Sequence, residues 1–127
     1  MNVPDTARID AAAVEIAPDG SRVHPLLALE SGSMAQFELD GGQVSRAVRH
    51  RSVEEIWLVL SGRGEIWRRG NGQESTVPLA PGVCVAITRG TAFQFRCIGD
   101  EALRIIAVTM PPWPGNEEAL LVPGKWC

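Results

Sequence analysis

The sequence predicts an all-β domain that forms a small barrel or a jelly roll. Short segments of the chain alternate apolar and polar residues, many of them β-branched or aromatic, as half-buried strands do. Glycine, proline and aspartate interrupt these segments about every eight to twelve residues, and helical periodicity is scarce. A meander of about nine short strands has to close or stack to hide its edges, which favours a barrel or jelly roll over an open sheet.

The expected strands fill the middle of the chain. They cover residues 22–30, 33–40, 44–50, 54–61, 64–70, 75–80, 83–88, 93–98 and 103–110, with turn-forming residues between them. Residues 1–21 are expected to form an N-terminal arm or an edge strand, and residues 22–110 the barrel. Residues 111–127 read as a proline-rich C-terminal arm with one helical turn in 116–121.

Composition excludes several classes of function. The chain has 127 residues, 45% of them hydrophobic and 21% charged, which suits one globular domain with one core. Its formal net charge of −3 offers no basic surface to nucleic acid or to an anionic membrane. No signal peptide or membrane span is recognisable, and Cys84, Cys97 and Cys127 form no CxxC pair. We therefore expect a reduced, cytoplasmic protein.

One stretch before the middle of the chain carries the spacing of a known motif. Gly42 is followed after five residues by Val48, and His50 comes two positions later. Glu55 follows His50 after four intervening residues, and Gly62 follows Glu55 after six. This spacing resembles the first motif of the cupin family, in which a histidine occupies the position of Val48.

A second stretch matches the frame of the second cupin motif. Gly82 and Gly90 fall on its two glycines. Thr88 stands for the proline of the motif, Phe93 for its histidine and Cys97 for its asparagine. The resemblance to the cupin family covers the whole predicted barrel.

The resemblance implies a double-stranded β-helix barrel that holds one divalent metal on three histidines and a glutamate. Of that ligand set this chain keeps only His50 and Glu55, because the side chains of Val48 and Phe93 have no lone pair to donate. We therefore expect no tightly bound cofactor.

An alternative register of the second motif stays open. If the turn before Phe93 is one residue shorter than in the family, Ala92 takes the lost histidine position and Gln94 joins the inward face. His50, Glu55 and Gln94 would then form a weak set of three ligands for a loosely held divalent transition metal.

Without a metal, His50 and Glu55 can divide the roles of acid and base in catalysis, because apolar neighbours shift the pKa values of both groups. Trp57 follows Glu55 on the same strand face, while Glu54 should point away. We expect Trp57 and Phe93 to contact a ligand, and Gln94 as well in the alternative register. The competing interpretation is that His50 and Glu55 only hydrogen-bond each other inside the barrel.

Arg46 lies two positions before Val48 and four before His50, so a regular strand would place all three side chains on one face. A guanidinium there would suit a carboxylate or phosphate of the ligand. The alternative is an arginine at the barrel rim in a surface salt bridge.

Two classes of function remain open. The first is an enzyme that acts on a small polar or anionic metabolite through His50 and Glu55. The second is a non-enzymatic ligand-binding or sensing barrel with a relic metal site. Trp67 and Trp113 could line a ligand mouth or cover the core, and the second role is preferred. We expect a homodimer, because an apolar outer sheet and two terminal arms can meet a partner, and no nucleic-acid or membrane partner.

Overall fold

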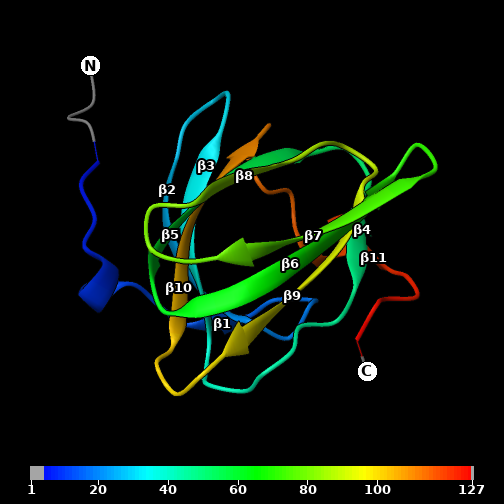
Figure 1. Cartoon of the computed structure of the whole chain (residues 1–127). Coiled ribbons are helices and arrows are strands. Elements are labelled where there is room, and N and C mark those ends of the chain that lie inside the picture. Colours follow the sequence, from blue (N-terminus) through cyan, green and yellow to red (C-terminus); the bar gives the residue numbers. More distant parts are fainter. Residues whose placement is uncertain (1–4, 127) are drawn as a thin grey trace.

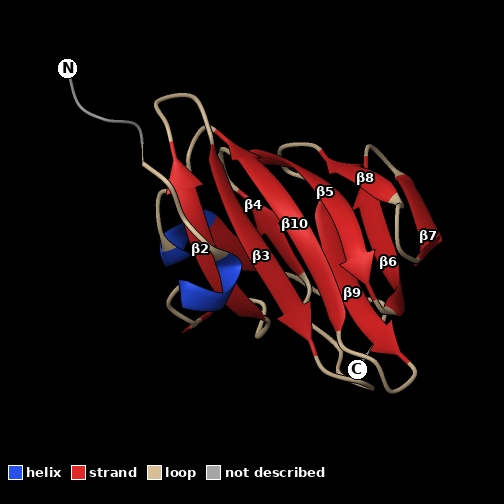
Figure 2. Ribbon diagram, turned by 90° about the vertical axis from the view of Figure 1, so that its left-hand side faces the viewer, coloured by secondary structure: helices blue, strands red, loops and turns tan. Residues whose placement is uncertain are grey.

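The computed structural model describes residues 5–126, which form two antiparallel sheets facing each other (Figures 1 and 2). The six-stranded sheet has the order β1-β2-β3-β10-β5-β8, with the respective bounds Glu15–Ile16, Arg22–Ala28, Ser33–Leu39, Leu103–Met110, Glu54–Ser61 and Cys84–Ile87. The five-stranded sheet has the order β11-β4-β9-β6-β7, with the bounds Ala119–Leu121, Val48–His50, Ala92–Ile98, Arg63–Gly70 and Gln73–Leu79. Two short 3-10 turns, η1 and η2, span Ile9–Ala11 and Asn116–Glu118.

The predicted all-β class and jelly-roll architecture are confirmed, and the nine expected strands are present as β2 to β10. The largest difference in bounds is in the segment 44–50, where strand β4 begins only at Val48. Two short strands complete the sheets: β1 pairs with β2, and β11 pairs with β4. Neither helical turn among the described residues has the length or the apolar run that a membrane span needs.

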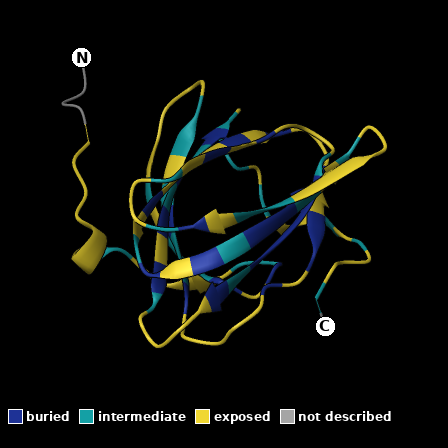
Figure 3. Ribbon diagram, viewed as in Figure 1, coloured by how far each residue is buried: buried dark blue, intermediate teal, exposed yellow. Residues whose placement is uncertain are grey.

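The main core lies between the two sheets (Figure 3). Trp57, Phe93 and Phe95 are its largest fully buried side chains. The Trp57 ring meets those of Phe93 and Phe95 edge-on, at centroid distances of 5.5 and 5.0 Å. Strand β5 alternates strictly between exposed and buried residues along most of its length, so Glu54 points to solvent and Glu55 into the interior, as the sequence predicted.

The C-terminal arm covers part of the outer face of the five-stranded sheet. Ala47, Trp67 and Ala92 form a second apolar cluster there, and Val122 and Trp126 of the arm pack against it. Trp67 therefore covers an apolar cluster, in agreement with the preferred interpretation. Because the arm packs on the face of β9 that carries Ala92, the opposite face of β9 points into the space between the sheets.

The part of the outer face of the six-stranded sheet that lies on β5 and the adjacent residues of β10 is apolar and at least partly exposed. Ile56, Leu58 and Leu60 point outward from β5 and are 47%, 42% and 43% exposed. Ile106 and Val108 of β10 lie directly beside Leu58 and Ile56 in the ladder. This stripe carries no charge, which matters for the oligomeric state.

The glycines of the two sequence motifs sit where the backbone turns with a positive φ. The φ angles are 81°, 80°, 92° and 80° at Gly42, Gly62, Gly82 and Gly90. At Gly62 a Cβ atom would also collide with the carbonyl oxygen of Ala102. The glycine spacing thus encodes the turns between strands and is independent of the ligand positions.

Candidate functional site

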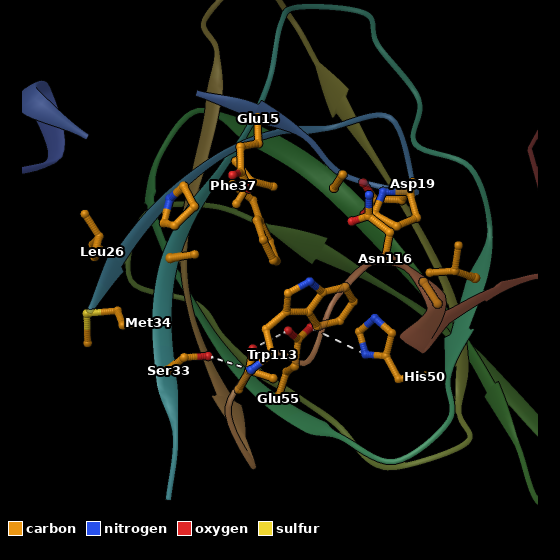
Figure 4. Close-up of a pocket in the computed structure, with 18 of the residues that line it drawn as sticks. Glu15, Asp19, Leu26, Ser33, Met34, Phe37, His50, Glu55, Trp113 and Asn116 are labelled. Carbon is orange, nitrogen blue, oxygen red and sulfur yellow. Dashed lines mark hydrogen bonds and ion pairs between the residues drawn. The ribbon is translucent and has the colours of Figure 1, made fainter. Parts of the chain in front are cut away.

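A cavity of about 350 Å³ lies between the β1-β2-β3 edge of the six-stranded sheet and strand β4 of the other sheet (Figure 4). Most of its wall is apolar. The polar side chains that line it are those of Glu15, Asp19, Ser33, His50, Glu55, Thr109 and Asn116. An apolar pocket with a few convergent polar groups is the usual form of a small-molecule site.

The short connection between β4 and β5 is held by the buried carboxylate of Glu118. Its oxygens accept hydrogen bonds from the backbone N–H groups of Ser52 and Val53 and from the Ser52 hydroxyl. His50 ends β4 and Glu55 lies at the start of β5. The Glu118 clamp therefore fixes the two strand ends that carry the predicted acid and base.

His50 is buried among aromatic rings and is only 5% exposed. Its ring meets those of Phe93 and Trp113 edge-on, each at a centroid distance of 5.2 Å. Its Nδ1 atom is buried and has no hydrogen-bond partner among the described residues. Burial lowers the pKa of His50 to about 4, against the Glu118 carboxylate, which raises it. The imidazole is thus neutral at pH 7.

Trp113 lines the cavity, whereas the sequence favoured a role in covering the core.

Glu55 is 2% exposed and is hydrogen-bonded through both oxygens. Trp57 Nε1 donates to Oε1 at 3.1 Å, and the hydroxyl of Thr109, the ladder partner of Glu55, donates to Oε2 at 2.6 Å. Burial raises the pKa of Glu55 to about 7; the Thr109 and Trp57 hydrogen bonds lower it and the Asp19 carboxyl raises it. His50 Nδ1 lies 3.9 Å from Glu55 Oε1, too far for the direct hydrogen bond considered from the sequence.

Asp19 is a cavity residue that the sequence analysis did not single out. It lies in the Pro-Asp-Gly turn between β1 and β2, which is closed by a hydrogen bond from Gly20 N to Ala17 O at 2.9 Å. Its Oδ1 accepts hydrogen bonds from Ser21 N at 2.9 Å and Ser21 Oγ at 2.6 Å, and burial raises the pKa of Asp19. The turn is recognisable from the sequence, but its position over the cavity depends on the fold.

Phe93 lines the cavity beside Val48, and the two residues are direct ladder partners between β9 and β4. The structure therefore places Phe93, not Ala92, at the lost histidine position. Trp57 lies beneath the cavity: it contacts Glu55 but belongs to the core and does not line the open space.

Gln94 lies on the opposite face of β9 and does not meet His50 or Glu55. Its Oε1 accepts hydrogen bonds from the backbone N–H groups of Lys125 and Trp126, both at 2.9 Å, and its Nε2 donates to two backbone carbonyls at the same distance. The alternative register is wrong because strand alternation turns Gln94 toward the C-terminal arm. Gln94 anchors that arm.

Arg46 is exposed and is not among the residues that line the cavity. The argument from strand parity fails here because regular strand geometry begins only at Val48. The backbone N–H of Arg46 instead donates to Asp19 O at 2.7 Å and holds the Asp19 turn in place.

The residues present do not fit the metal centre that the cupin resemblance implies. Two of its four ligand positions hold Val48 and Phe93, which cannot donate a lone pair. Within residues 5–126, no group of three or more His, Cys, Asp or Glu side chains is arranged to hold a metal ion. The groups of this site that can take part in binding or catalysis are therefore the side chains that line the cavity.

Comparisons with known proteins identify the fold. The model of the family described as "Cupin domain" matches residues 35–109. A predicted oxalate decarboxylase from Thermotoga maritima superposes with a TM-score of 0.69 at 21% identity, over 84% of this chain and 98% of that one. KdgF from Halomonas sp. gives a TM-score of 0.71 at 17% identity, over 84% and 94%. The Drosophila melanogaster CENP-C cupin domain gives 0.71 at 15% identity, over 81% and 73%. No curated protein sequence matches the chain.

Replacement of Glu55 by Gln should change how stability depends on pH. Because burial raises the pKa of Glu55 from 4.5 to about 7, the folded state keeps a proton that the unfolded state releases. The free energy of unfolding of the wild type should therefore lose about 3 kcal/mol from this group as the pH rises through that interval. Urea denaturation at a series of pH values should show Glu55→Gln gaining that amount relative to the wild type, whereas Glu54→Gln should follow the wild type. Parallel profiles for Glu55→Gln and the wild type would contradict the assignment.

Restoration of the missing donors should create a metal site. Protein purified without added metal is expected to carry well under one transition-metal ion per chain, measured by elemental analysis. Val48→His combined with Phe93→His should raise nickel or manganese content toward one ion per chain, because both positions line the cavity with His50 and Glu55. The matched pair Val48→His with Ala92→His should not, since Ala92 faces the C-terminal arm. A stoichiometric ion in the wild type would refute this account.

Proposed function

Because this chain belongs to the cupin family, we propose that its cavity binds a small organic molecule that hydrogen-bonds to Glu55 and His50. One observation carries the proposal. His50 lines a cavity of about 350 Å³ next to the carboxyl group of Glu55, and its buried Nδ1 atom has no hydrogen-bond partner within residues 5–126. Buried polar groups are usually paired, so an unpaired one beside an open space suits a bound ligand.

The cavity favours an uncharged or positively charged ligand over the anionic metabolite expected from the sequence. No lysine or arginine is found among the described residues that line it, and the expected anchor, Arg46, points to solvent. The exposed side chains of Ile16, Leu27 and Met34 lie at the apolar side of the cavity. They suit a ligand that combines an apolar body with one polar group.

We further propose that the cavity catalyses a reaction of the bound ligand by proton transfer. A carboxyl group with a pKa of about 7 can give or accept a proton near neutral pH, which is what a general acid or base needs. In such a step protonated Glu55 would give its proton to one atom of the ligand, and the resulting carboxylate would take a proton from a different atom of the ligand, while neutral His50 would orient the polar group. The reaction would be a proton shift within the ligand.

Binding without turnover is the second candidate. Both oxygens of Glu55 already accept hydrogen bonds, from Trp57 and Thr109, which limits their freedom to exchange protons. The structural neighbours include both a predicted oxalate decarboxylase and the CENP-C cupin domain, so the shared fold favours neither candidate.

The binding proposal predicts that phenylpropanol, an uncharged probe with an apolar body and a hydroxyl group, stabilises the protein. At ten times its Kd it should add roughly 1.4 kcal/mol, or about 5 °C in Tm. Ala35→Trp should abolish the effect by filling the cavity that Ala35 lines. The matched variant Ala86→Trp should keep it, because Ala86 is exposed on β8 and lies outside the cavity. The proposal fails if the alcohol and its charged analogues all leave Tm unchanged.

The homodimer expected from the sequence stays a prediction, and the outer face of the six-stranded sheet is the surface that suits it. The exposed stripe of Ile56, Leu58 and Leu60 is uncharged, so two copies could meet through it without like-charge repulsion. Light scattering on the eluting protein should give twice the mass of one chain. Leu58→Glu should shift the protein to a monomer; a monomeric wild type at micromolar concentration would show the prediction to be wrong.

A further inference from the structure

The charged groups around the cavity are all of one kind. Asp19 and Glu55 are buried in its wall, and Glu15 lies among the lining residues at the surface. Since the described lining residues include no lysine or arginine, no cation of the wall offsets these carboxyl groups. Burial favours the protonated forms of Asp19 and Glu55 when no ligand is bound, and a positively charged ligand would favour their ionised forms by direct attraction.

The oxygens of the Asp19 and Glu55 carboxyl groups differ in how many hydrogen bonds they accept from the protein. Both hydrogen bonds to the Asp19 side chain end on Oδ1, so Oδ2 has no partner among them. Glu55 Oε1 accepts a hydrogen bond from Trp57, and an ionised carboxylate oxygen can accept another. Asp19 Oδ2 and Glu55 Oε1 can therefore each accept a further hydrogen bond.

His50 provides an independent sign of a missing hydrogen-bond partner. It is 5% exposed, and none of the described residues forms a hydrogen bond with its Nδ1 atom. The 3.9 Å between Nδ1 and Glu55 Oε1 is too long for a hydrogen bond between them, but a donor nitrogen placed between the two atoms could reach both. Because Nδ1 is shielded from solvent, the nearby Trp113 ring would have to move aside to admit such a group.

The same part of the cavity offers aromatic surface. Trp113, Phe37 and Phe93 line it, and Figure 4 shows the Trp113 ring lying across the cavity, near Glu55 and His50. The backbone N–H of Trp113 donates to Ser33 Oγ at 3.0 Å, which ties the C-terminal arm to the cavity wall. Aromatic faces attract organic cations, most strongly in the case of tryptophan.

We propose that the ligand of this cavity is an organic amine, whose protonated nitrogen is held by the carboxyl groups of Asp19 and Glu55 and whose apolar body packs against Trp113 and Met34. This inference rests on the proposed function, since it names the class of molecule that the same cavity binds. A primary ammonium ion has three N–H donors, and the acceptors that we assign to it are Asp19 Oδ2, Glu55 Oε1 and, with His50 in the tautomer that carries its proton on Nε2, His50 Nδ1.

The experiment compares three probes that share one apolar body and differ only in the polar group: phenylpropylamine, phenylpropanol and phenylpropionate. Isothermal titration calorimetry of the full chain at neutral pH should give a Kd for the amine about tenfold or more below that of the alcohol. The carboxylate should bind more weakly than either. The expected preference corresponds to one favourable cation–π or charge-assisted contact.

Substitutions of residues that line the cavity test which groups recognise the positive charge of the amine. Asp19→Asn and Glu55→Gln should each reduce the affinity for the amine about tenfold while changing that for the alcohol much less, because they remove charge and keep shape. Trp113→Leu should also reduce the affinity for the amine more than the affinity for the alcohol. Glu54→Gln, an exposed change on the strand that carries Glu55, should alter neither affinity.

The outcomes separate the two proposals. If the alcohol binds as tightly as the amine, or the carboxylate binds best, the amine inference is overturned while the binding function stands. If the amine preference persists in Asp19→Asn and Glu55→Gln, the cation is recognised elsewhere and the inference is again overturned. If none of the three probes binds, both proposals fail.

Discussion

The removal of the Glu55 carboxyl group from water is the constraint on which the rest of the site depends. Strand alternation in β5 turns this side chain inward, and Trp57 and Thr109 supply hydrogen bonds that make its burial tolerable. The burial raises the pKa of Glu55 to about 7, and the same aromatic surroundings keep His50 neutral. A carboxyl group and an imidazole thus lie side by side, both buried, without forming an ion pair.

The apolar residues at two positions of the implied metal centre also set the chemistry of the cavity. Val48 and Phe93 occupy neighbouring positions on β4 and β9, where they close the space around His50 with apolar surface. Histidines there would add donors and bring water or a metal into the wall. The polar groups of the described residues that line the cavity are acidic or neutral, which is why we assign the cavity to an uncharged or cationic molecule.

Local patterns predicted the strands and the motif glycines well, because alternation and turn chemistry act over a few residues. The resemblance to the first cupin motif also placed His50 and Glu55 together. The prediction for Arg46 failed because the backbone before Val48 is not a regular strand. The prediction for Gln94 failed because its side chain lies on the face of β9 that packs against the C-terminal arm, to which it is hydrogen-bonded. The contributions of Asp19 and Glu118 depend on contacts between segments far apart in the chain, which no local pattern reports.

The protonation states of Glu55 and His50 carry the central claim, and a carbon NMR titration of the labelled side chains measures them directly. The account predicts that the Glu55 carboxyl titrates near pH 7 and that the His50 imidazole stays neutral down to about pH 4. Comparison with Glu55→Gln and with a His50→Gln variant would assign the two resonances. An ordinary carboxyl pKa near 4.5 for Glu55, or protonation of His50 above pH 6, would contradict it.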